Sequence, residues 1–304
     1  MLNESSAQNA EFRAGFIALT GVPGCGKSTL LNRLTGFKLS IISGKPQTTR
    51  NNIAAIIDGE KSQMIFLDTP GLLRPEYGLQ KSMLAQARRA ATEDADIVCL
   101  MAEPRLPAAK DKELLTHLGR LKVPIFLLIN KIDTVHDPSV PEKAEQAYAQ
   151  WFSLRHTFRI SALTGLGVDG LKSFLEQSLP EHAPYYPPGQ VTDRFERFFA
   201  GELVREQVFR LYSDEIPYCV AVEIDAFTEN SGEADIIHAS LHVERASQKP
   251  IIIGRGGCNL RRLRENAQAE IIKMLGRKAR LELTVKVTPG WRNDPRFLKS
   301  LEGR

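Results

Sequence analysis

Residues 21–28 read G-V-P-G-C-G-K-S and match G-x-x-x-x-G-K-[ST], the pattern of a phosphate-binding loop. Its glycines let the backbone pass close to a ligand, so that N–H groups point at phosphate oxygens. Lys27 can reach the β- and γ-phosphates, and the Ser28 hydroxyl can coordinate Mg²⁺. The sequence therefore predicts a nucleotide site, and the residues assigned to it are Gly21, Val22, Pro23, Gly24, Cys25, Gly26, Lys27, Ser28 and Thr29.

A second motif, D-T-P-G, follows the apolar run 64–67. A carboxylate at a strand end can hold Mg²⁺, usually through a water, and the N–H of Gly71 can meet a γ-phosphate. Alone, this pattern is also a common turn. It starts about 40 residues after the phosphate loop, and that spacing favours the nucleotide interpretation. The residues assigned here are Asp68, Thr69, Pro70 and Gly71.

The motif N-K-I-D at 130–133 follows another apolar run, 125–129. Guanine presents two adjacent donors, N1–H and the 2-amino group, and the carboxylate of Asp133 can accept both. Adenine lacks that pair and would leave the carboxylate desolvated and poorly matched. Taken alone, N-K-I-D could be an exposed polar turn. In order after the two phosphate motifs, it predicts guanine.

Two further predictions concern the same side of the nucleotide. Asn130 is expected to tie its loop to the phosphate loop, and Lys131 to lay its stem along the base. S-A-L at 161–163 follows the apolar run 158–160, and the N–H of Ala162 is expected to meet guanine O6. The residues assigned to this side are Asn130, Lys131, Asp133, Ser161, Ala162 and Leu163.

Between the first two motifs lies K-P-Q-T-T-R, residues 45–50. A threonine from a mobile loop completes the Mg²⁺ shell in folds of this kind, and either Thr48 or Thr49 is the candidate. Such a loop is ordered by the γ-phosphate and released on hydrolysis, which predicts a switch. The predicted metal ligands are Ser28, Thr48, Thr49 and Asp68; the predicted catalytic residues are Lys27, Thr49 and Gly71.

The elements that must position these residues alternate between apolar strands and helical stretches. Strands are predicted at 16–19, 53–57, 63–67, 97–101, 125–129 and 158–160, and helices from 29 onward and at 79–92, 110–121, 141–154 and 168–178. This alternation predicts an α/β domain with a mostly parallel sheet and helices on both faces. Ligands bind at the carboxyl ends of the strands in such sheets, where the motifs fall.

A proline-rich stretch, L-P-E-H-A-P-Y-Y-P-P-G at 179–189, marks a domain boundary because four prolines cannot sit in regular structure. We predict a polar tail at 1–14, a GTPase domain at 15–180, a linker at 181–192 and a smaller α+β domain at 193–304. In the last, helices are expected at 194–211 and 259–275, and strands at 218–227, 236–244, 250–253 and 280–287.

The second domain carries the spacing G-x-x-G, at Gly254 and Gly257. In KH domains such a loop clamps a nucleic-acid backbone. Residues 255–280 contain eight basic and two acidic side chains, an electrostatic footprint for phosphates. The alternative is a solvated charged helix. The residues predicted to bind RNA are Ile253, Gly254, Arg255, Gly256, Gly257, Arg261, Arg262 and Arg264.

Composition sets outer bounds on these predictions. The chain has 304 residues, of which 42% are hydrophobic and 25% charged, and a formal net charge of +4. This is the profile of a globular protein of about two domains. Its four cysteines form no C-x-x-C pair, which argues against a zinc site and for a reducing compartment. No run approaches a membrane span, and the polar N-terminus lacks a signal-peptide core, so a cytoplasmic location is expected.

Together these motifs resemble the Era family, GTPases related to translation factors. The resemblance covers nearly the whole chain and implies a GTPase domain followed by a type II KH domain. It also implies GTP and GDP as ligands, Mg²⁺, binding to the 3′ region of 16S ribosomal RNA, and assistance in 30S subunit maturation. The family is cytoplasmic with peripheral membrane association. A monomer without an obligate protein partner is expected.

Two residues bear on the rate of hydrolysis. Leu72 follows Gly71 where other GTPases have a glutamine that orients the attacking water, and the Era family shares this replacement. Slow intrinsic hydrolysis, stimulated by RNA or the ribosome, is therefore expected. Gly24 stands where the family usually has asparagine, which in related GTPases helps to place a monovalent cation. This departure argues against stimulation by potassium.

Three other interpretations remain. The nucleotide domain could be a regulated binding module with negligible catalysis, which single-turnover hydrolysis with and without ribosomal RNA would distinguish. An RNA-modification GTPase would use the same motifs but often has a functional cysteine near its C-terminus, whereas this sequence ends L-K-S-L-E-G-R. A P-loop kinase is disfavoured because N-K-I-D would have no purpose in it.

Overall fold

The computed structural model describes residues 12–230 and 232–302 and divides into two compact units. The first unit comprises the chain up to Ser40, together with Thr49–Arg74 and Met83–Asp193. The second comprises Ile41–Thr48, Pro75–Ser82 and the chain from Arg194 onward. Two short segments that lie between the nucleotide motifs in sequence therefore belong to the unit built mainly from the C-terminal part of the chain.

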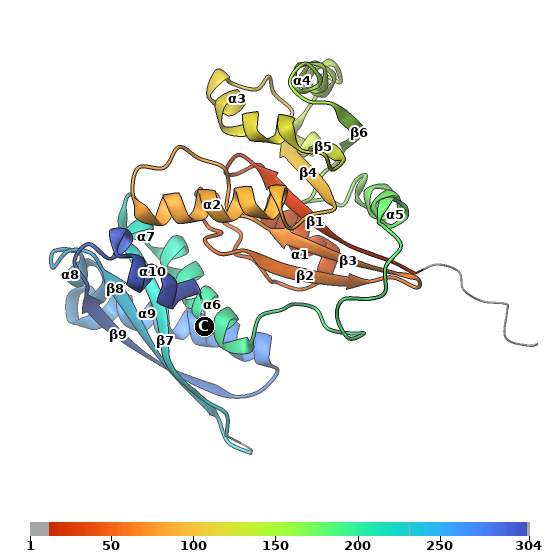
Figure 1. The fold of residues 1–304 in the computed structure, drawn as a ribbon. Coiled ribbons are helices and arrows are strands. Elements are labelled where there is room, and N and C mark those ends of the chain that lie inside the picture. The colour runs from red at the N-terminus through yellow and green to blue at the C-terminus, as the bar shows by residue number, and fades with distance from the viewer. Residues whose placement is uncertain (1–11, 231, 303–304) are drawn as a thin grey trace, which may run out of the picture. The chain divides into compact units, whose positions relative to one another are not determined.

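A six-stranded sheet forms the centre of the first unit, in the order β2-β3-β1-β4-β5-β6 (Figure 1). Only β2, which pairs with β3, is antiparallel to its neighbour. The carboxyl ends of the parallel strands therefore share one edge, as the predicted α/β domain requires. The strands are β1 (Arg13–Gly21), β2 (Ile53–Asp58), β3 (Ser62–Asp68), β4 (Ile97–Ala102), β5 (Ile125–Ile129) and β6 (Leu154–Arg159).

Helices cover both faces of this sheet. On one face, apolar residues of α2, α3 and α4 share a buried cluster with alternate residues of β4 and β5, including Leu100 and Leu127. On the other face, Phe126 of β5 meets Phe174 of α5, with ring centroids 5.5 Å apart, and α1 packs on β1–β3. The helices are α1 (Lys27–Thr35), α2 (Gly78–Thr92), α3 (Ala109–Leu115), α4 (Ser139–Ala149) and α5 (Val168–Ser178).

Several predicted boundaries in this unit are wrong. β1 begins at Arg13, so residues 13 and 14 belong to the strand, where they pair with Ser62 and Gln63, and not to the polar tail. The predicted helix 141–154 ends at Ala149, because Phe152 turns into the core and Leu154 pairs with β5. The predicted helix 110–121 splits into α3 and a 3₁₀ turn, Thr116–Arg120. Most of the predicted tail, residues 1–11, lies outside the described residues.

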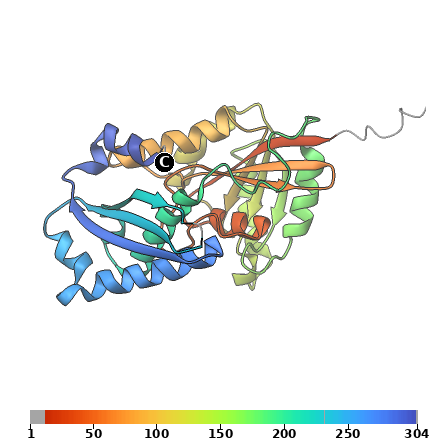
Figure 2. The same ribbon diagram turned by 90° about the horizontal axis from the view of Figure 1, so that it is seen from below.

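The second unit contains a three-stranded sheet, β7-β8-β9, in which β7 is antiparallel and β9 parallel to β8 (Figure 2). Helices α6 and α9 pack together and against the sheet, and alternate residues of β8, such as Ile237 and Leu241, point into the core between them. The elements are α6 (Glu196–Leu211), α7 (Ile216–Cys219), β7 (Val220–Thr228), β8 (Asp235–Val243), α8 (Gln248–Ile253), α9 (Cys258–Leu275), β9 (Ala279–Val287) and α10 (Pro295–Glu302).

One predicted strand in this unit, 250–253, is instead the end of helix α8. A short apolar run cannot be assigned to strand or helix from periodicity alone. Pro250 is tolerated because it lies in the first turn of the helix, where a backbone N–H has no intrahelical partner. Within the described residues, no helix combines the length and the apolar character that crossing a membrane requires.

Candidate functional site

The phosphate loop connects the end of β1 to the start of α1, the strand–loop–helix order that the motif requires. Gly26 has φ 102°, and a Cβ there would lie 2.2 Å from Nδ2 of Asn130, so a side chain does not fit. The Lys27 ammonium group is buried within the loop, where it donates to the carbonyls of Gly21 and Val22, each at 3.2 Å. The loop is therefore closed around its own lysine.

Three predicted metal ligands meet beside this loop. The hydroxyl oxygens of Ser28 and Thr49 lie 2.9 Å apart. Both face Oδ2 of Asp68, at 3.2 Å from Ser28 Oγ and 3.4 Å from Thr49 Oγ1. Ser40, which the sequence analysis did not identify, donates to the same carboxylate oxygen at 2.7 Å. Residues far apart in sequence thus bring their side-chain oxygen atoms together, and we call this cluster of Ser28, Ser40, Thr49 and Asp68 the metal corner.

The electrostatics of this corner suit a divalent cation. Asp68 is fully buried, and burial raises the pKa of its carboxyl group above the ordinary value, although hydrogen bonds from Ser40 and the charge of Lys27 oppose this shift. Within the part of the chain that the structure describes, its Oδ1 is buried without a hydrogen-bond partner. An unpaired buried carboxylate oxygen is costly, and a bound cation with oxygen ligands such as Mg²⁺ would satisfy it.

The two candidate threonines make different contacts. Thr49 is at the corner with Ser28 and Asp68, whereas the carbonyl of Thr48 accepts a hydrogen bond from the guanidinium group of Arg205. Thr49 therefore has its hydroxyl beside the other predicted metal ligands, and its role as a metal ligand stays a prediction.

Gly71 and Leu72 close the site on the side of the phosphate loop. A Cβ at Gly71 would lie 2.8 Å from Cα of Pro23, so only glycine fits at this close approach of two backbones. The N–H of Leu72 donates to the carbonyl of Gly21 at 3.0 Å, and its side chain is fully buried. Leu72 has no polar side-chain atom with which to orient a water.

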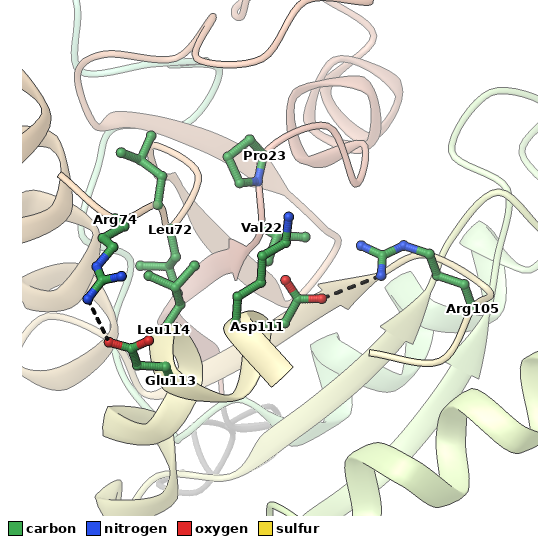
Figure 3. A pocket seen from close by; sticks show the side chains of 10 residues that line it. Val22, Pro23, Leu72, Arg74, Arg105, Asp111, Glu113 and Leu114 are labelled. Carbon is green, nitrogen blue, oxygen red and sulfur yellow. Dashed lines mark hydrogen bonds and ion pairs between the residues drawn. The ribbon is translucent and has the colours of Figure 1, made fainter. Parts of the chain in front are cut away.

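A cavity of about 440 Å³ adjoins this side of the phosphate loop (Figure 3). Pro23 and Leu72 face it from the loops, and Leu114 of α3 lines it as well. Two ion pairs flank it, one between Arg74 and Glu113 at 4.0 Å and one between Arg105 and Asp111 at 3.5 Å. Its wall is therefore apolar near Leu72 and charged at the sides.

Asn130 joins the two loops on the base side of the nucleotide site, as predicted. Its Nδ2 donates to the carbonyl of Cys25 at 2.8 Å, and its Oδ1 accepts from the N–H of Ala162 at 2.8 Å. The second contact engages the Ala162 N–H that was assigned to guanine O6, and the contact with guanine stays a prediction. The amide of Asn130 needs both a donor and an acceptor partner once it is buried, and the Ala162 N–H supplies the donor.

Asp133 lies in a short 3₁₀ turn after β5, Ile132–Thr134, and Lys131 directly precedes this turn. Asp133 is exposed, so its carboxylate is open to a base. The Lys131 ammonium group lies 2.5 Å from Oε1 of Glu103. Partial burial raises the pKa of Glu103, but hydrogen bonds from Lys131 and Arg105 outweigh burial and hold that pKa below its ordinary value. Glu103 is therefore an anion that positions Lys131.

Residues missed by the sequence analysis support these loops. Arg33 of α1 donates through Nε to the carbonyl of Ala162 at 2.6 Å and through Nη2 to that of Leu163, and so holds the S-A-L loop. Glu103 follows the end of β4, the same position that identified the other motifs, and could have been found by that signal. Nothing in the sequence marks Arg33 or Ser40, because their roles depend on tertiary contacts.

The predicted RNA loop lies between two helices of the second unit. Helix α8 ends at Ile253, and Gly254 adopts φ 74°, where a Cβ would lie 2.7 Å from the Asn259 side chain. A 3₁₀ turn, Arg255–Gly257, leads into α9. A Cβ at Gly256 would meet no atom within 4 Å, so the backbone here is open to a ligand.

The predicted RNA-binding side chains do not all serve one surface. Arg261 and Arg264 line a cavity of about 230 Å³ with Gly257 and Leu260. Arg262 is exposed but is not among the residues that line this cavity, and Ile253 packs against the hydrophobic core of the unit. The cavity therefore combines two cations with an apolar wall next to the glycine loop.

Two protein-family models match the chain. One, described as "50S ribosome-binding GTPase", matches residues 16–131, and one described as "KH domain" matches residues 215–292. The chain is 45% identical over 289 residues to the GTPase Era of Elusimicrobium minutum (strain Pei191), covering 95% of this chain and 96% of the relative. It is 41% identical over 294 residues to the GTPase Era of Lactobacillus helveticus (strain DPC 4571), covering 97% of each.

Solved structures give the same result. A single-residue variant of Aquifex aeolicus Era bound to GDP·AlF4⁻ is 34% identical, with a TM-score of 0.91, and the match covers 95% of this chain and 99% of that one. An Era complex with MgGDPNP and nucleotides 1506–1542 of 16S ribosomal RNA is also 34% identical, with a TM-score of 0.91, covering 95% and 98%.

Proposed function

The chain belongs to the Era family of GTPases, and we propose that it is a Mg²⁺-dependent switch that binds the 3′ region of 16S ribosomal RNA and assists maturation of the 30S subunit. The meeting of Ser28, Thr49 and Asp68 at one corner of the phosphate loop carries the nucleotide half of this proposal. The relative bound to MgGDPNP and 16S ribosomal RNA supports the RNA half.

The nucleotide site supplies contacts to each part of GTP. The N–H groups of the phosphate loop and the N-terminus of α1 would hold the phosphates, and Lys27 would leave its carbonyl partners to reach the β- and γ-oxygens. Ser28, Thr49 and Asp68 would hold Mg²⁺, which neutralises charge on the phosphates when bound. Asp133 would accept the two guanine donors.

RNA would bind at the loop between α8 and α9. The open backbone at Gly256 allows a phosphate to approach closely, and Arg261 and Arg264 supply positive charge at the adjacent cavity. The apolar wall formed by Leu260 and Leu283 suits the faces of unstacked bases.

Neighbouring threonines provide a sharp test of the metal site. We expect Thr49→Ala to lower GTP hydrolysis at least about 10-fold and to raise the Mg²⁺ concentration needed for half-maximal rate, as damage to a metal site does. Thr48→Ala is the matched control, because Arg205 contacts the backbone carbonyl of Thr48, which the substitution keeps. Equal effects of the two substitutions on the Mg²⁺ titration would contradict the assignment of Thr49.

The RNA site is tested by the double variant Arg255→Asp/Gly256→Asp. Two carboxylates beside the RNA backbone should weaken binding of an RNA with the sequence of the 16S 3′ end at least about 10-fold, while GTP affinity is unchanged. The control, Lys143→Asp/Gln146→Asp, makes the same charge change on the exposed face of α4. Unchanged RNA affinity in the first variant would show that the groove is assigned wrongly.

We further propose a cytoplasmic location with peripheral membrane contact. The family resemblance supports it, and all four cysteines are free thiols, as is usual in a reducing compartment. Fractionation of cells into soluble and membrane pools, with detection of the protein in each, tests this proposal. Recovery outside the cytoplasmic and membrane-associated fractions would contradict it.

A further inference from the structure

The segment Ile41–Thr48 belongs to the same compact unit as helix α6, whereas Ser40 and Thr49 belong to the unit that holds the nucleotide. The chain thus leaves the nucleotide unit after Ser40, which donates to Asp68, and re-enters it at Thr49, which faces Asp68. The position of Thr49 therefore depends on how the segment between them is held.

Arg205 of α6 holds the end of this segment. Its guanidinium group donates through Nη2 to the carbonyl of Thr48, the residue directly before Thr49. Glu202, one turn earlier on α6, fixes that guanidinium group by accepting from Nε at 2.8 Å and from Nη2, and the ring of Phe209 lies 5.6 Å from it. The Arg205 side chain is only 3% exposed, so its contact is shielded from water and salt.

Lys45 holds the middle of the same segment. Its ammonium group donates to the carbonyl of Phe209 at 2.6 Å and to that of Tyr212, at the C-terminal end of α6. These carbonyls lack helical partners, and a cation there also complements the helix dipole. Between the two anchors, Gln47 adopts φ 64°, a conformation that costs free energy for a residue other than glycine. The segment is therefore held in one strained shape by contacts at its middle and at its C-terminal end.

We propose that Arg205 is a positioning residue for GTP hydrolysis, which fixes the backbone at Thr48 so that the hydroxyl of Thr49 stays beside Ser28 and Asp68. The inference rests on the proposed role of Thr49 as a metal ligand. A free loop would lose conformational entropy each time it closed over the nucleotide. Arg205 lowers that entropy cost because it holds the loop before the nucleotide binds. Its effect should therefore appear in GTP hydrolysis, which needs Thr49, and not in GDP binding.

The test compares Arg205→Met, which removes the guanidinium group but keeps a long stem, with Arg210→Met on the same helix. Arg210 pairs with Glu206 at 3.1 Å and is half exposed, which makes it a matched control. We expect Arg205→Met to lower kcat for GTP about 10- to 100-fold, the loss typical of one charge-assisted hydrogen bond. The Mg²⁺ concentration for half-maximal hydrolysis should rise, whereas GDP affinity should change less than about twofold. Arg205→Lys should recover part of the rate.

Separate readouts keep this inference apart from the proposed function. Wild-type protein that neither binds nor hydrolyses GTP would overturn the proposed function itself. A folded Arg205→Met protein with wild-type kcat and Mg²⁺ dependence, or with equal losses of GTP and GDP affinity, would overturn the role of Arg205. If that variant does not fold, Lys45→Met takes its place, because Lys45 is only half-buried, and the same split between GTP and GDP is required of it.

Discussion

Gly24 is the residue of the phosphate loop at which this chain leaves the pattern of its family. It adopts φ 81°, and a Cβ there would meet no atom within 4 Å. The space for a side chain is therefore present, and the backbone conformation is one that asparagine tolerates better than other residues with a Cβ. What the site lacks is an amide oxygen, not room for it.

We expect hydrolysis by the wild-type protein to proceed at the same rate, within about twofold, in potassium and in sodium chloride at equal ionic strength. The Gly24→Asn variant should hydrolyse GTP faster in potassium chloride than in sodium chloride, because the amide oxygen of the asparagine can ligate a monovalent cation in the open space beside the phosphates. Steady-state phosphate release in the two salts measures both. A wild-type rate several-fold higher in potassium would show that another group supplies the ligand.

Individual residues also show where sequence reasoning reaches its limit. The pairing of Asn130 with the phosphate loop could be predicted, because motif spacing and strand ends place the two loops at one sheet edge. The engagement of the Ala162 N–H by the same side chain could not, since it depends on which hydrogen bonds remain open after burial. The same limit applies to Ser40, which has no sequence signal and yet donates to Asp68.

At the scale of elements, strand β8 carries a buried histidine, His242, on the face of the sheet opposite to helices α6 and α9. His242 Nδ1 lies 2.8 Å from the Thr288 hydroxyl, its Nε2 lies 3.3 Å from Glu223, and its ring contacts Phe297 of α10 at 4.9 Å. Burial lowers the pKa of His242 below its ordinary value of 6.5, against the opposing effect of the Glu223 charge. The neutral ring therefore fits the strand better than the charged one.

This shift predicts a loss of stability in acid. The unfolded chain takes up a proton on this histidine near pH 6.5, whereas the folded unit resists it until a lower pH, so the stabilising contribution is present above pH 6.5 and is lost as pH falls through the folded pKa. His242→Gln should flatten this dependence. Urea unfolding at pH 7.5 and 5.5, followed by Trp291 fluorescence in a Trp151→Phe background, measures it.

The control for this prediction is His238→Gln on the same strand. His238 is 46% exposed and pairs with Glu282 at 3.3 Å, so its loss should leave the acid dependence of unfolding in place. If both variants keep the wild-type dependence, His242 is not its source. Trp291 is fully buried and therefore reports on the second unit, which matters because two units need not unfold in one transition.

Helix α8 illustrates what element prediction misses. Its residues 250–253 form an apolar run that suits a strand or a helix equally. The chain becomes helical there because the Tyr212 hydroxyl donates to the Ile252 carbonyl and Asn259 donates to that of Ile251, contacts that tie the end of α8 to other elements. By contrast, the regular spacing of apolar residues in α5 was enough to predict both ends of that helix correctly.

At the scale of the whole molecule, one chain combines a nucleotide site whose loop residue Leu72 is apolar with a glycine loop in a second unit, which we propose binds RNA. The buried Leu72 cannot orient an attacking water. The proposed function therefore calls for a partner that completes or reshapes the site. The segments Ile41–Thr48 and Pro75–Ser82, which lie between the nucleotide motifs in sequence, belong to the second unit.

We expect slow hydrolysis by the purified protein and an increase of at least about 10-fold when an RNA containing the 3′ end of 16S ribosomal RNA is added. Single-turnover hydrolysis with and without this RNA measures the effect. Arg255→Asp/Gly256→Asp should keep the slow rate and lose the increase, because it removes RNA binding only. Rapid turnover without any partner would contradict the prediction.

The sequence by itself determined the nature of the ligands and the family of the chain. Phosphate, guanine and RNA recognition each depend on short motifs whose chemistry is local: glycines that admit a phosphate, a carboxylate that matches guanine, a G-x-x-G turn beside arginines. Parallel strands then bring the separate motifs to one edge, which the alternation of elements also predicts.

Only the tertiary structure decided which of two adjacent threonines faces Asp68, and that the segment preceding Thr49 is anchored by Arg205 and Lys45 on α6. The reason is physical. Which side chain is delivered to a site depends on where a loop's backbone groups find their hydrogen-bond partners, and these partners lie about 160 residues away in sequence, beyond the reach of any local pattern.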